Sequence, residues 1–199
     1  GFNESRVQVT NAHLTDFTGG GATYGFTLTA VDGGPVEVFL LAGAGTDDAG
    51  NLSTESATLR VTYDPTGPST TLSSIAPDPA TVSPIPVTVV FSEPVFGFEA
   101  PDIAVTNGSV ENFSGDGSVF TFDLAPTELG PVTAAIRAGV AQDEAGNANT
   151  ASNQFTRVFG STRPVATLSS TATEPTNETG IPVTALFTDP GTGEQLDVT

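Results

Sequence analysis

Apolar and polar residues alternate along short stretches of this chain, with a period of two. In residues 118–125, Phe120, Phe122 and Leu124 fall on one side of an extended backbone, and polar residues fall between them. Clusters of Gly, Pro, Asn and Asp separate such stretches. The pattern predicts β-strands with one buried face and one face in water, and it predicts no helix.

In the middle of the chain this pattern predicts seven strands at the spacing of an all-β sandwich. The second and sixth strands should each turn three apolar residues inward, which gives both sheets an apolar inner layer. The predicted strands are residues 69–75, 85–92, 102–106, 110–114, 118–125, 131–138 and 152–159.

The whole pattern recurs along the chain at a fixed shift of 96 residues, so that residue 1 corresponds to residue 97. GFNESRVQVTN at 1–11 aligns without a gap with GFEAPDIAVTN at 97–107. DDAGNLSTES at 47–56 aligns in the same way with DEAGNANTAS at 143–152. A repeat of this length is typical of a small domain, so we predict tandem modules that each close their own core.

The phase of the repeat divides the chain into one complete module and two partial ones. Residues 67–162 form the complete module, 1–66 a partial module that lacks its first two strands, and 163–199 a partial module with only those two strands. The joining segments are short and contain proline, so we expect neighbouring modules to nearly touch in an extended rod. We expect the two ends to belong to a window within a longer array.

Charge narrows the range of partners. The chain has 23 acidic residues against five basic ones, all arginine, and a net charge of −18. This potential repels nucleic acid and anionic membranes. It also repels other copies of the chain unless salt screens it or divalent cations neutralise it at particular places.

Several residue types are absent. Without cysteine or lysine, the chain can form neither disulfides nor Lys–Asn isopeptide cross-links, so packing and metal ions are left as sources of rigidity. No run of about 18 apolar residues is present, so we predict no membrane insertion. The pattern favours the mature part of a secreted or cell-surface protein.

Three segments of the complete module carry a family resemblance. SPIPVTVVFSEPVFGFEAPDIAVTNG, FTFDL and GPVTAAIRAGVAQDEAGNANTAS, in that order, resemble the bacterial immunoglobulin-like (BIg) domains of large surface proteins and adhesins. The resemblance implies tandem seven-stranded immunoglobulin-like β-sandwiches. Such domains serve as spacers, fibre units or receptor-binding tips and are typically non-enzymatic, so the fold alone does not fix the function.

Two equivalent loops carry the best candidates for metal binding. Each places two carboxylates and an amide oxygen around a glycine, and hard oxygen ligands of this kind suit calcium. The alternative interpretation is a tight turn whose acidic side chains face solvent. The candidate ligands are Asp143, Glu144 and Asn147 in the complete module and Asp47, Asp48 and Asn51 in the first one.

Strand direction adds further candidates. When successive strands of a sandwich alternate in direction, every second connection returns to the same end of the domain. The loops after the second, fourth and sixth strands should therefore lie together, bringing Glu93 and Asp102 toward Asp143. The linker residue Asp64 should reach the same junction. We predict that calcium binds there, offsets the repulsion between the acids and stiffens the joint.

Catalytic residue sets are largely missing. His13 is the only histidine, which excludes histidine-based triads and multi-histidine zinc sites. Tryptophan is absent and tyrosine occurs twice, so the carboxylates lack the aromatic platform of a sugar hydrolase. We therefore predict that the protein is not an enzyme.

The preferred function is a non-catalytic structural module of a secreted bacterial surface fibre or adhesin. Its expected partners are neighbouring immunoglobulin-like repeats, other copies in a fibre, and an unidentified cell-surface or glycan receptor. Two alternatives stay open. One is an accessory or carbohydrate-binding domain array of an extracellular enzyme. The other is a self-assembling filament subunit, in which the tail of one molecule completes the head of the next by strand addition.

Overall fold

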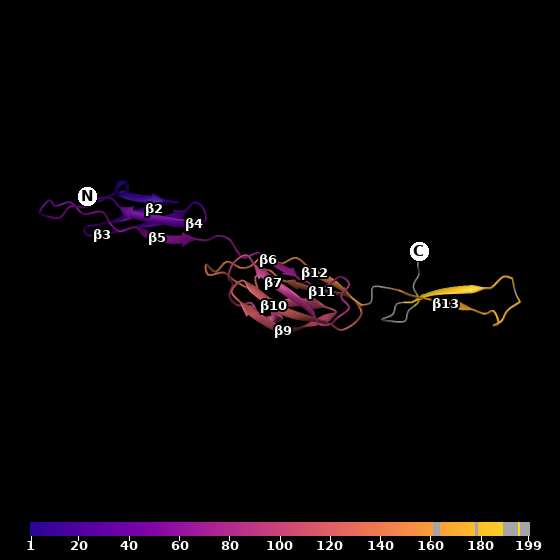
Figure 1. The fold of residues 1–199 in the computed structure, drawn as a ribbon. Helices are drawn as coiled ribbons and strands as arrows, with labels where there is room; N and C mark the ends of the chain where they lie inside the picture. The colour runs from indigo at the N-terminus through magenta and orange to yellow at the C-terminus, as the bar shows by residue number, and fades with distance from the viewer. Residues whose placement is uncertain (161–163, 178, 189–194, 196–199) are drawn as a thin grey trace. The chain divides into compact units, whose positions relative to one another are not determined.

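The computed structural model describes residues 1–160, 164–177, 179–188 and 195 (Figure 1). The regular secondary structure of the described residues consists of antiparallel β-strands and two short 3-10 helices, which confirms the predicted all-β fold class. The chain divides into two compact units, Gly1–Thr66 (unit 1) and Gly67–Thr199 (unit 2). The predicted boundary at 162/163 lies outside the described residues.

Unit 1 begins with the 3-10 helix η1 (Glu4–Arg6). Its strands are β1 (Val7–Thr10), β2 (Ala12–Gly20), β3 (Thr23–Ala30), β4 (Gly34–Leu40) and β5 (Leu59–Tyr63).

The described part of unit 2 contains nine strands and the 3-10 helix η2 (Ala100–Asp102). The strands are β6 (Thr70–Ser73), β7 (Ile85–Phe91), β8 (Ile103–Thr106), β9 (Gly108–Asp116), β10 (Val119–Pro126), β11 (Gly130–Ile136), β12 (Phe155–Phe159), β13 (Val165–Ser170) and β14 (Val183–Thr188).

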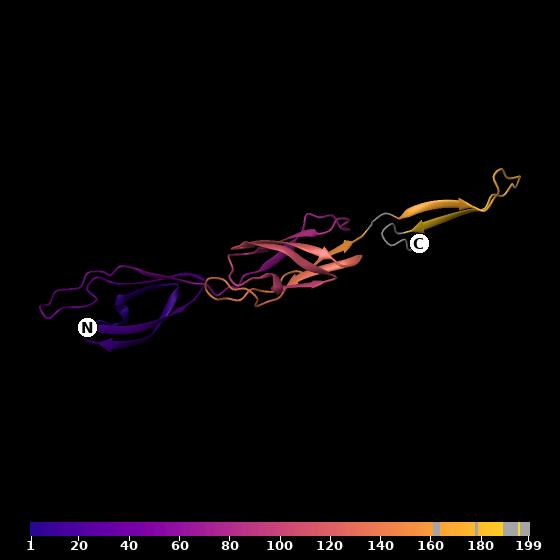
Figure 2. The ribbon, with the colours of Figure 1, turned by 90° about the horizontal axis from the view of Figure 1, so that it is seen from below.

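Strands β6 to β12 form a two-layered sandwich (Figures 1 and 2). One sheet has the order β6-β7-β10-β9 and the other has the order β12-β11-β8. Four strands facing three, in this order, is the arrangement of an immunoglobulin constant-type domain. All seven strands predicted from the sequence are present.

The core of the sandwich lies between the inner faces of the two sheets. Strand β7 buries every second residue, because alternate side chains of a strand point to opposite faces. Strand β11 supplies the facing layer from the other sheet. The fully or almost fully buried residues of these two strands are Ile85, Val87, Val89, Phe91, Val132, Ala134 and Ile136.

Strand β12 begins at Phe155 rather than at the predicted residue 152, because the two polar residues there bond through their side chains. The Ile136 amide donates to Ser152 Oγ at 2.9 Å. The Leu72 amide donates to Asn153 Oδ1 at 2.8 Å, and Asn153 Nδ2 donates to the Leu72 carbonyl at 3.1 Å. Asn153 thereby joins the segment before β12 to β6 in the facing sheet.

Unit 1 repeats part of this plan. It pairs β1-β4-β5 in one sheet and β2-β3 in a second. The strand registers match those of unit 2 when each residue number is shifted by 96. The described part of unit 1 contains no counterpart of β6 or β7. Its apolar interior is less covered, since Leu59 and Val61 in β5 are 62% and 60% exposed.

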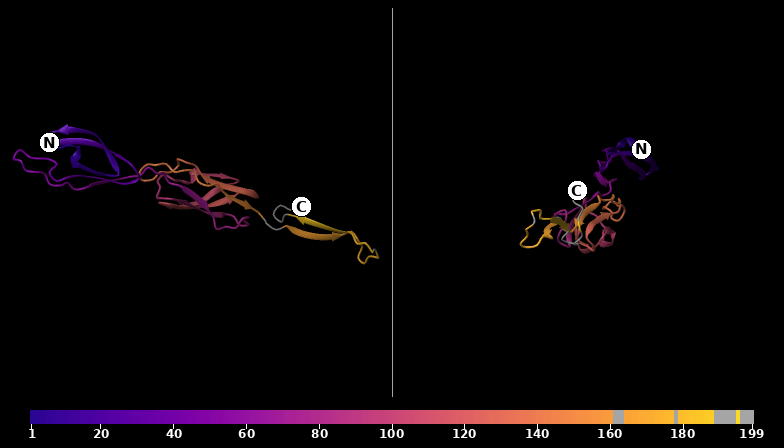
Figure 3. Two further views of the ribbon diagram at one scale, coloured as in Figure 1. Left: turned by 90° about the horizontal axis from the view of Figure 1, so that it is seen from above. Right: turned by 90° about the vertical axis from the view of Figure 1, so that its right-hand side faces the viewer.

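Strands β13 and β14 pair antiparallel as a two-stranded ribbon (Figure 3). Their register reproduces that of β6 and β7: Leu72 pairs with Val89, and Leu168 pairs with Ala185. The ribbon is therefore a second copy of the first two strands of the sandwich.

The core assignment predicts that substitution of two adjacent valines of β7 has very different effects on the stability of the sandwich. Val89 is 0% exposed and Val90 is 42% exposed. We expect Val89→Ala to destabilise the sandwich by about 2 kcal/mol, from lost apolar burial and the cavity left behind. Val90→Ala should change stability by less than about 0.5 kcal/mol. Urea unfolding of both variants checks this, and equal losses would contradict the assignment.

Candidate metal site

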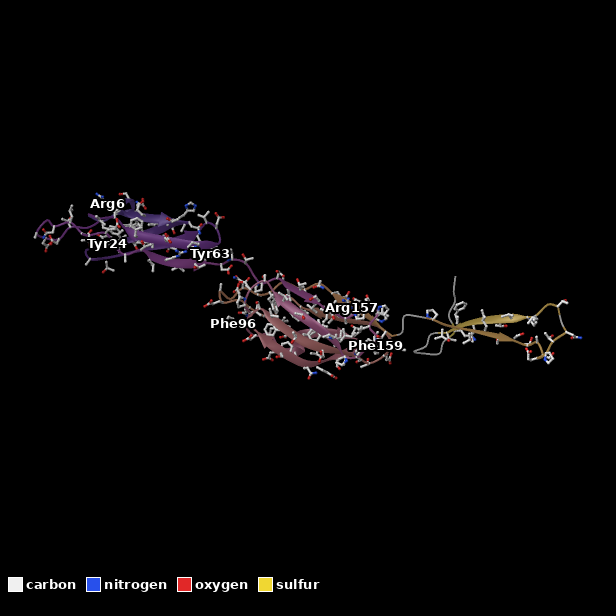
Figure 4. The ribbon with its side chains drawn as sticks, in the orientation of Figure 1. Arg6, Tyr24, Tyr63, Phe96, Arg157 and Phe159 are labelled. Atoms are coloured by element: carbon white, nitrogen blue, oxygen red, sulfur yellow. The ribbon has the colours of Figure 1, made fainter. Side chains whose placement is uncertain are left out.

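Three loops meet at one end of the sandwich in unit 2. The Phe96 amide donates to the Gln142 carbonyl at 2.8 Å, and the Gln142 amide donates back to the Phe96 carbonyl at 3.1 Å. The Val95 amide donates to the Gly117 carbonyl at 3.0 Å. The loops that follow β7, β9 and β11 therefore lie together, which confirms the prediction from strand direction. Phe96 projects from this end of the unit (Figure 4).

Residues 143–147 form a compact turn closed by an aspartate and an asparagine, here called the Asp–Asn turn. Asp143 Oδ1 accepts from the Asn147 amide at 2.8 Å, and Oδ2 accepts from Asn147 Nδ2 at 2.9 Å. Gly146 has a φ of 88°, a conformation that favours glycine. The spacing of Asp, Gly and Asn in the sequence therefore specifies the turn locally.

The environment of Asp143 sets its ionisation. Its residue surface is only 5% exposed. Burial alone would raise the pKa of the Asp143 carboxyl, but the side chain of Asn147 and the backbone amides of the turn donate to the carboxylate and outweigh that effect. The net result is a lowered pKa, so Asp143 is an anion at neutral pH.

A buried asparagine holds the same loop in place. Asn149 is 2% exposed, and its Oδ1 accepts from the amides of Val140 and Ala141, both at 2.9 Å. Its Nδ2 donates to the carbonyls of Arg137 and Thr150. All four bonds fix the backbone on either side of the Asp–Asn turn. The sequence interpretation did not single out Asn149, because in the sequence a buried loop asparagine cannot be distinguished from an asparagine in an ordinary turn.

Glu93 lies beside Asp143. A carboxylate oxygen of each lies within 4.8 Å of the other, so one cation could contact both. Glu93 is half-buried and follows β7, whereas Asp143 follows β11. Two acids from distant parts of the chain are thus held close together, in an all-oxygen donor set of the kind that calcium and magnesium prefer.

The linker enters unit 2 next to this loop. Gly67 lies so close to the Ala148 carbonyl oxygen that an added Cβ would clash with it, and the Thr150 amide donates to the Pro68 carbonyl at 2.8 Å. No other residue type fits at Gly67 without a shift of the backbone. The predicted ligand Asp64 precedes this point, and its Oδ1 accepts from the Thr66 amide at 3.0 Å.

Other predicted ligands of unit 2 are placed differently. Asp102 ends η2, and its Oδ2 accepts from the Glu99 amide at 2.8 Å in a capping box. Glu144 is exposed on the rim of the turn. Neither belongs to the group of closely spaced acids found among the described residues. The structure therefore brings Glu93 and Asp143 together and leaves Asp102 in a capping role.

Unit 1 contains the same turn at residues 47–51. Asp47 Oδ1 accepts from the Asn51 amide at 2.8 Å, and Oδ2 accepts from Asn51 Nδ2 at 2.9 Å. The side chain of Asn51, followed by backbone amides, lowers the pKa of Asp47. Here both Asp47 and Asp48 are exposed, and the described part of unit 1 has no counterpart of Glu93.

Comparison with known families agrees with the fold. Residues 64–158 match the family model for the bacterial Ig-like domain. The chain therefore contains a bacterial Ig-like domain over these residues, as the sequence resemblance predicted. This family is non-catalytic, and its members typically occur in surface proteins.

Searches of curated proteins and of solved structures returned no match. Within the part of the chain that the structure describes, no helix has the length and apolar character needed to cross a bilayer.

The Asp–Asn turn predicts a pH-dependent contribution to stability. Asp143→Asn removes an acceptor that faces the Asn147 amide group, so we expect a clearly lower melting temperature at neutral pH. Because the folded pKa of Asp143 is lowered, its contribution is fully present above the unfolded pKa of about 3.9 and is lost as the pH falls through the folded value. The difference between wild type and variant should therefore shrink in acid.

Differential scanning calorimetry from neutral pH into acid, with chelator present, measures this difference. Asp47→Asn is the matched control, and its effect should be smaller because Asp47 is exposed. A melting difference that does not change with pH would contradict the assigned role of the Asp143 carboxylate.

Proposed function

We propose that this chain is a non-catalytic structural segment of a secreted bacterial surface fibre or adhesin, in which tandem Ig-like modules form an extended rod. The observation that carries the proposal is the repeat itself. One whole module closes its own core, and its sequence recurs on both sides across short proline-bearing joints. Tandem copies of a module provide length and repeated surface, whereas an enzyme needs a single pocket.

We further propose that calcium stiffens the joint before the complete module. Glu93 and Asp143 supply two carboxylates in close proximity. Asp64 is three residues before Gly67, so the extended chain between them spans at most about 10 Å, and Asp64 can supply a third carboxylate to the same ion. Carbonyl oxygens and water would complete the six to eight ligands that calcium takes.

The chemistry of the ion is electrostatic. A divalent cation offsets the repulsion among acids in a chain of net charge −18 and ties a linker residue to the loop that follows β11. The residues of the chain hold the ligands in position: the Asp–Asn turn orients Asp143, and Asn149 fixes the loop around it. An affinity of about 0.1–1 mM is typical of extracellular calcium modules.

Calcium should therefore raise the melting temperature of the sandwich. At about 100 times the dissociation constant, a ligand that binds only the folded state adds about 2.7 kcal/mol. We expect Glu93→Gln to remove most of this shift, Asp64→Asn to reduce it, and Glu144→Gln to leave it unchanged, because Glu144 lies outside the group of closely spaced acids. Calorimetry in calcium, in chelator and in sodium chloride of equal ionic strength makes the comparison.

Small-angle X-ray scattering of the full chain tests the rod. Calcium should narrow the distribution of interatomic distances at long range, and chelator should broaden it. Scattering and melting curves that are the same in both conditions would overturn the calcium-stiffened joint. A compact particle in both conditions would also overturn the rod.

A further inference from the structure

The first and last segments of the complete module run side by side along the sandwich. Residues 67–80 contain β6, residues 148–160 contain β12, and the contacts between them are here called the entry–exit interface. The residue numbers rise together on both sides, so the two segments are parallel. The contacting pairs are Gly67 with Ala148, Pro68 with Thr150, Leu72 with Asn153, Ser74 with Arg157, Asp78 with Val158, and Ala80 with Val158 and Gly160.

Backbone hydrogen bonds hold the exit end of this interface. The Ala80 amide donates to the Val158 carbonyl at 2.7 Å, and the Gly160 amide donates to the Ala80 carbonyl at 3.0 Å. Ala80 and Phe159 thereby form a parallel β-bridge. The Val158 amide donates to Asp78 Oδ1 at 3.0 Å. The segment that follows β6 is thus attached to the last residues of β12.

Two side chains connect the middle of the interface. Asn153 accepts from the Leu72 amide and donates to the Leu72 carbonyl. Arg157 Nη2 donates to the Ser74 carbonyl at 3.3 Å. The Arg157 Cζ lies 4.8 Å from the centroid of the Phe155 ring, which is within the range of cation–π attraction. Since β6 and β12 belong to different sheets, these side chains provide the bonds that a strand ladder would otherwise supply.

Neither side chain is needed to form the last strand of a module. Unit 1 has Ala57 at the position of Asn153 and Val61 at the position of Arg157. Its strand β5 nevertheless pairs with β4 in the same register as β12 with β11. Asn153 and Arg157 therefore serve the connection to the first segment rather than the pairing within the sheet.

The direction of the two segments decides how the interface responds to tension. The chain enters and leaves the sandwich at opposite ends (Figure 1), and Arg157 and Phe159 lie at the far end from Phe96 (Figure 4). Tension along the chain pulls the first segment one way and the last segment the other way. Because the segments are parallel, they must slide past each other, and all the bonds between them are strained at once. Bonds between antiparallel strands pulled from the same end break one at a time.

We propose that the entry–exit interface is a mechanical clamp that keeps the sandwich folded when the array is under tension. The proposal rests on the rod function proposed above, because only a module within a tethered array is pulled from both ends. The clamp consists of hydrogen bonds inside one sandwich, so it works without calcium. Unfolding under force is governed by the rate of unfolding, and the bonds that break first set that rate.

Single-molecule force spectroscopy of the full chain in chelator tests the clamp. The chain has no cysteine, so Gly1→Cys and Thr199→Cys provide two unique attachment points. Unfolding of the sandwich is recognised by the length that residues 67–160 release, at about 3.6 Å per residue.

Asn153→Ala removes both bonds to Leu72. It should raise the unfolding rate of the sandwich at a fixed force at least about tenfold, because two hydrogen bonds are lost and their backbone partners are left unpaired. Arg157→Met keeps the apolar stem and removes the single bond to Ser74, so its effect should have the same sign and be smaller.

Asn107→Ala is the matched control. The Asn107 side chain also bonds to backbone groups, donating to the carbonyls of Glu128 and Pro131, but it lies outside the entry–exit interface. We expect Asn107→Ala to lower the melting temperature at least as much as Asn153→Ala and to leave the unfolding rate under force unchanged. A clamp residue and a residue that only stabilises the fold are thereby distinguished.

A second pulling direction makes the measurement independent of any variant. Attachment through Glu128→Cys and Thr199→Cys pulls β11 and β12 apart from the end where Gly130 pairs with Phe159, so their bonds open one at a time. The sandwich should unfold at a clearly lower force in this direction. Equal forces in the two directions would overturn the clamp, and so would an Asn153→Ala variant that unfolds under force like wild type. The scattering and calcium experiments test the rod separately.

Discussion

The sandwich depends on the burial of one strand, β7. It pairs with β6 on one side and with β10 on the other, while its inward residues face the second sheet. A chain without disulfides that is built from domains of this size must obtain its stability from such a shared apolar layer. In unit 1, whose described residues include no counterpart of β6 or β7, Leu59 and Val61 are exposed. The other features of the module therefore depend on a closed core.

At the end of the sandwich, local interactions form the Asp–Asn turn and long-range interactions bring Glu93 close to Asp143. The Asp–Asn turn forms from residues within a stretch of five, so it is the same in both units even though Asp143 is buried and Asp47 is exposed. The approach of Glu93 to Asp143 requires the complete sandwich, because the two acids follow different strands. Gly67 and Asn149 then fix the backbone around the turn.

The sequence was sufficient for features that follow from the two-residue alternation within a strand or from the alternating direction of successive strands. Alternation placed all seven strands of the complete module, and strand direction brought the loop of Glu93 to that of Asp143. It was insufficient where a side chain replaces a backbone partner. Asn153 shortens β12, Asn149 fixes a loop, and Asp102 caps a short helix, and each role depends on a partner that the local pattern does not reveal.

The locality of the Asp–Asn turn bears on how an array of this kind can change over generations. Every bond of the turn lies inside one short stretch, so gene duplication or recombination passes it on intact wherever the breakpoints fall outside that stretch. The pairing of Glu93 with Asp143 is inherited only when a copied segment contains both residues. Copies with different breakpoints can therefore share the same loop shape while differing in their acidic neighbours.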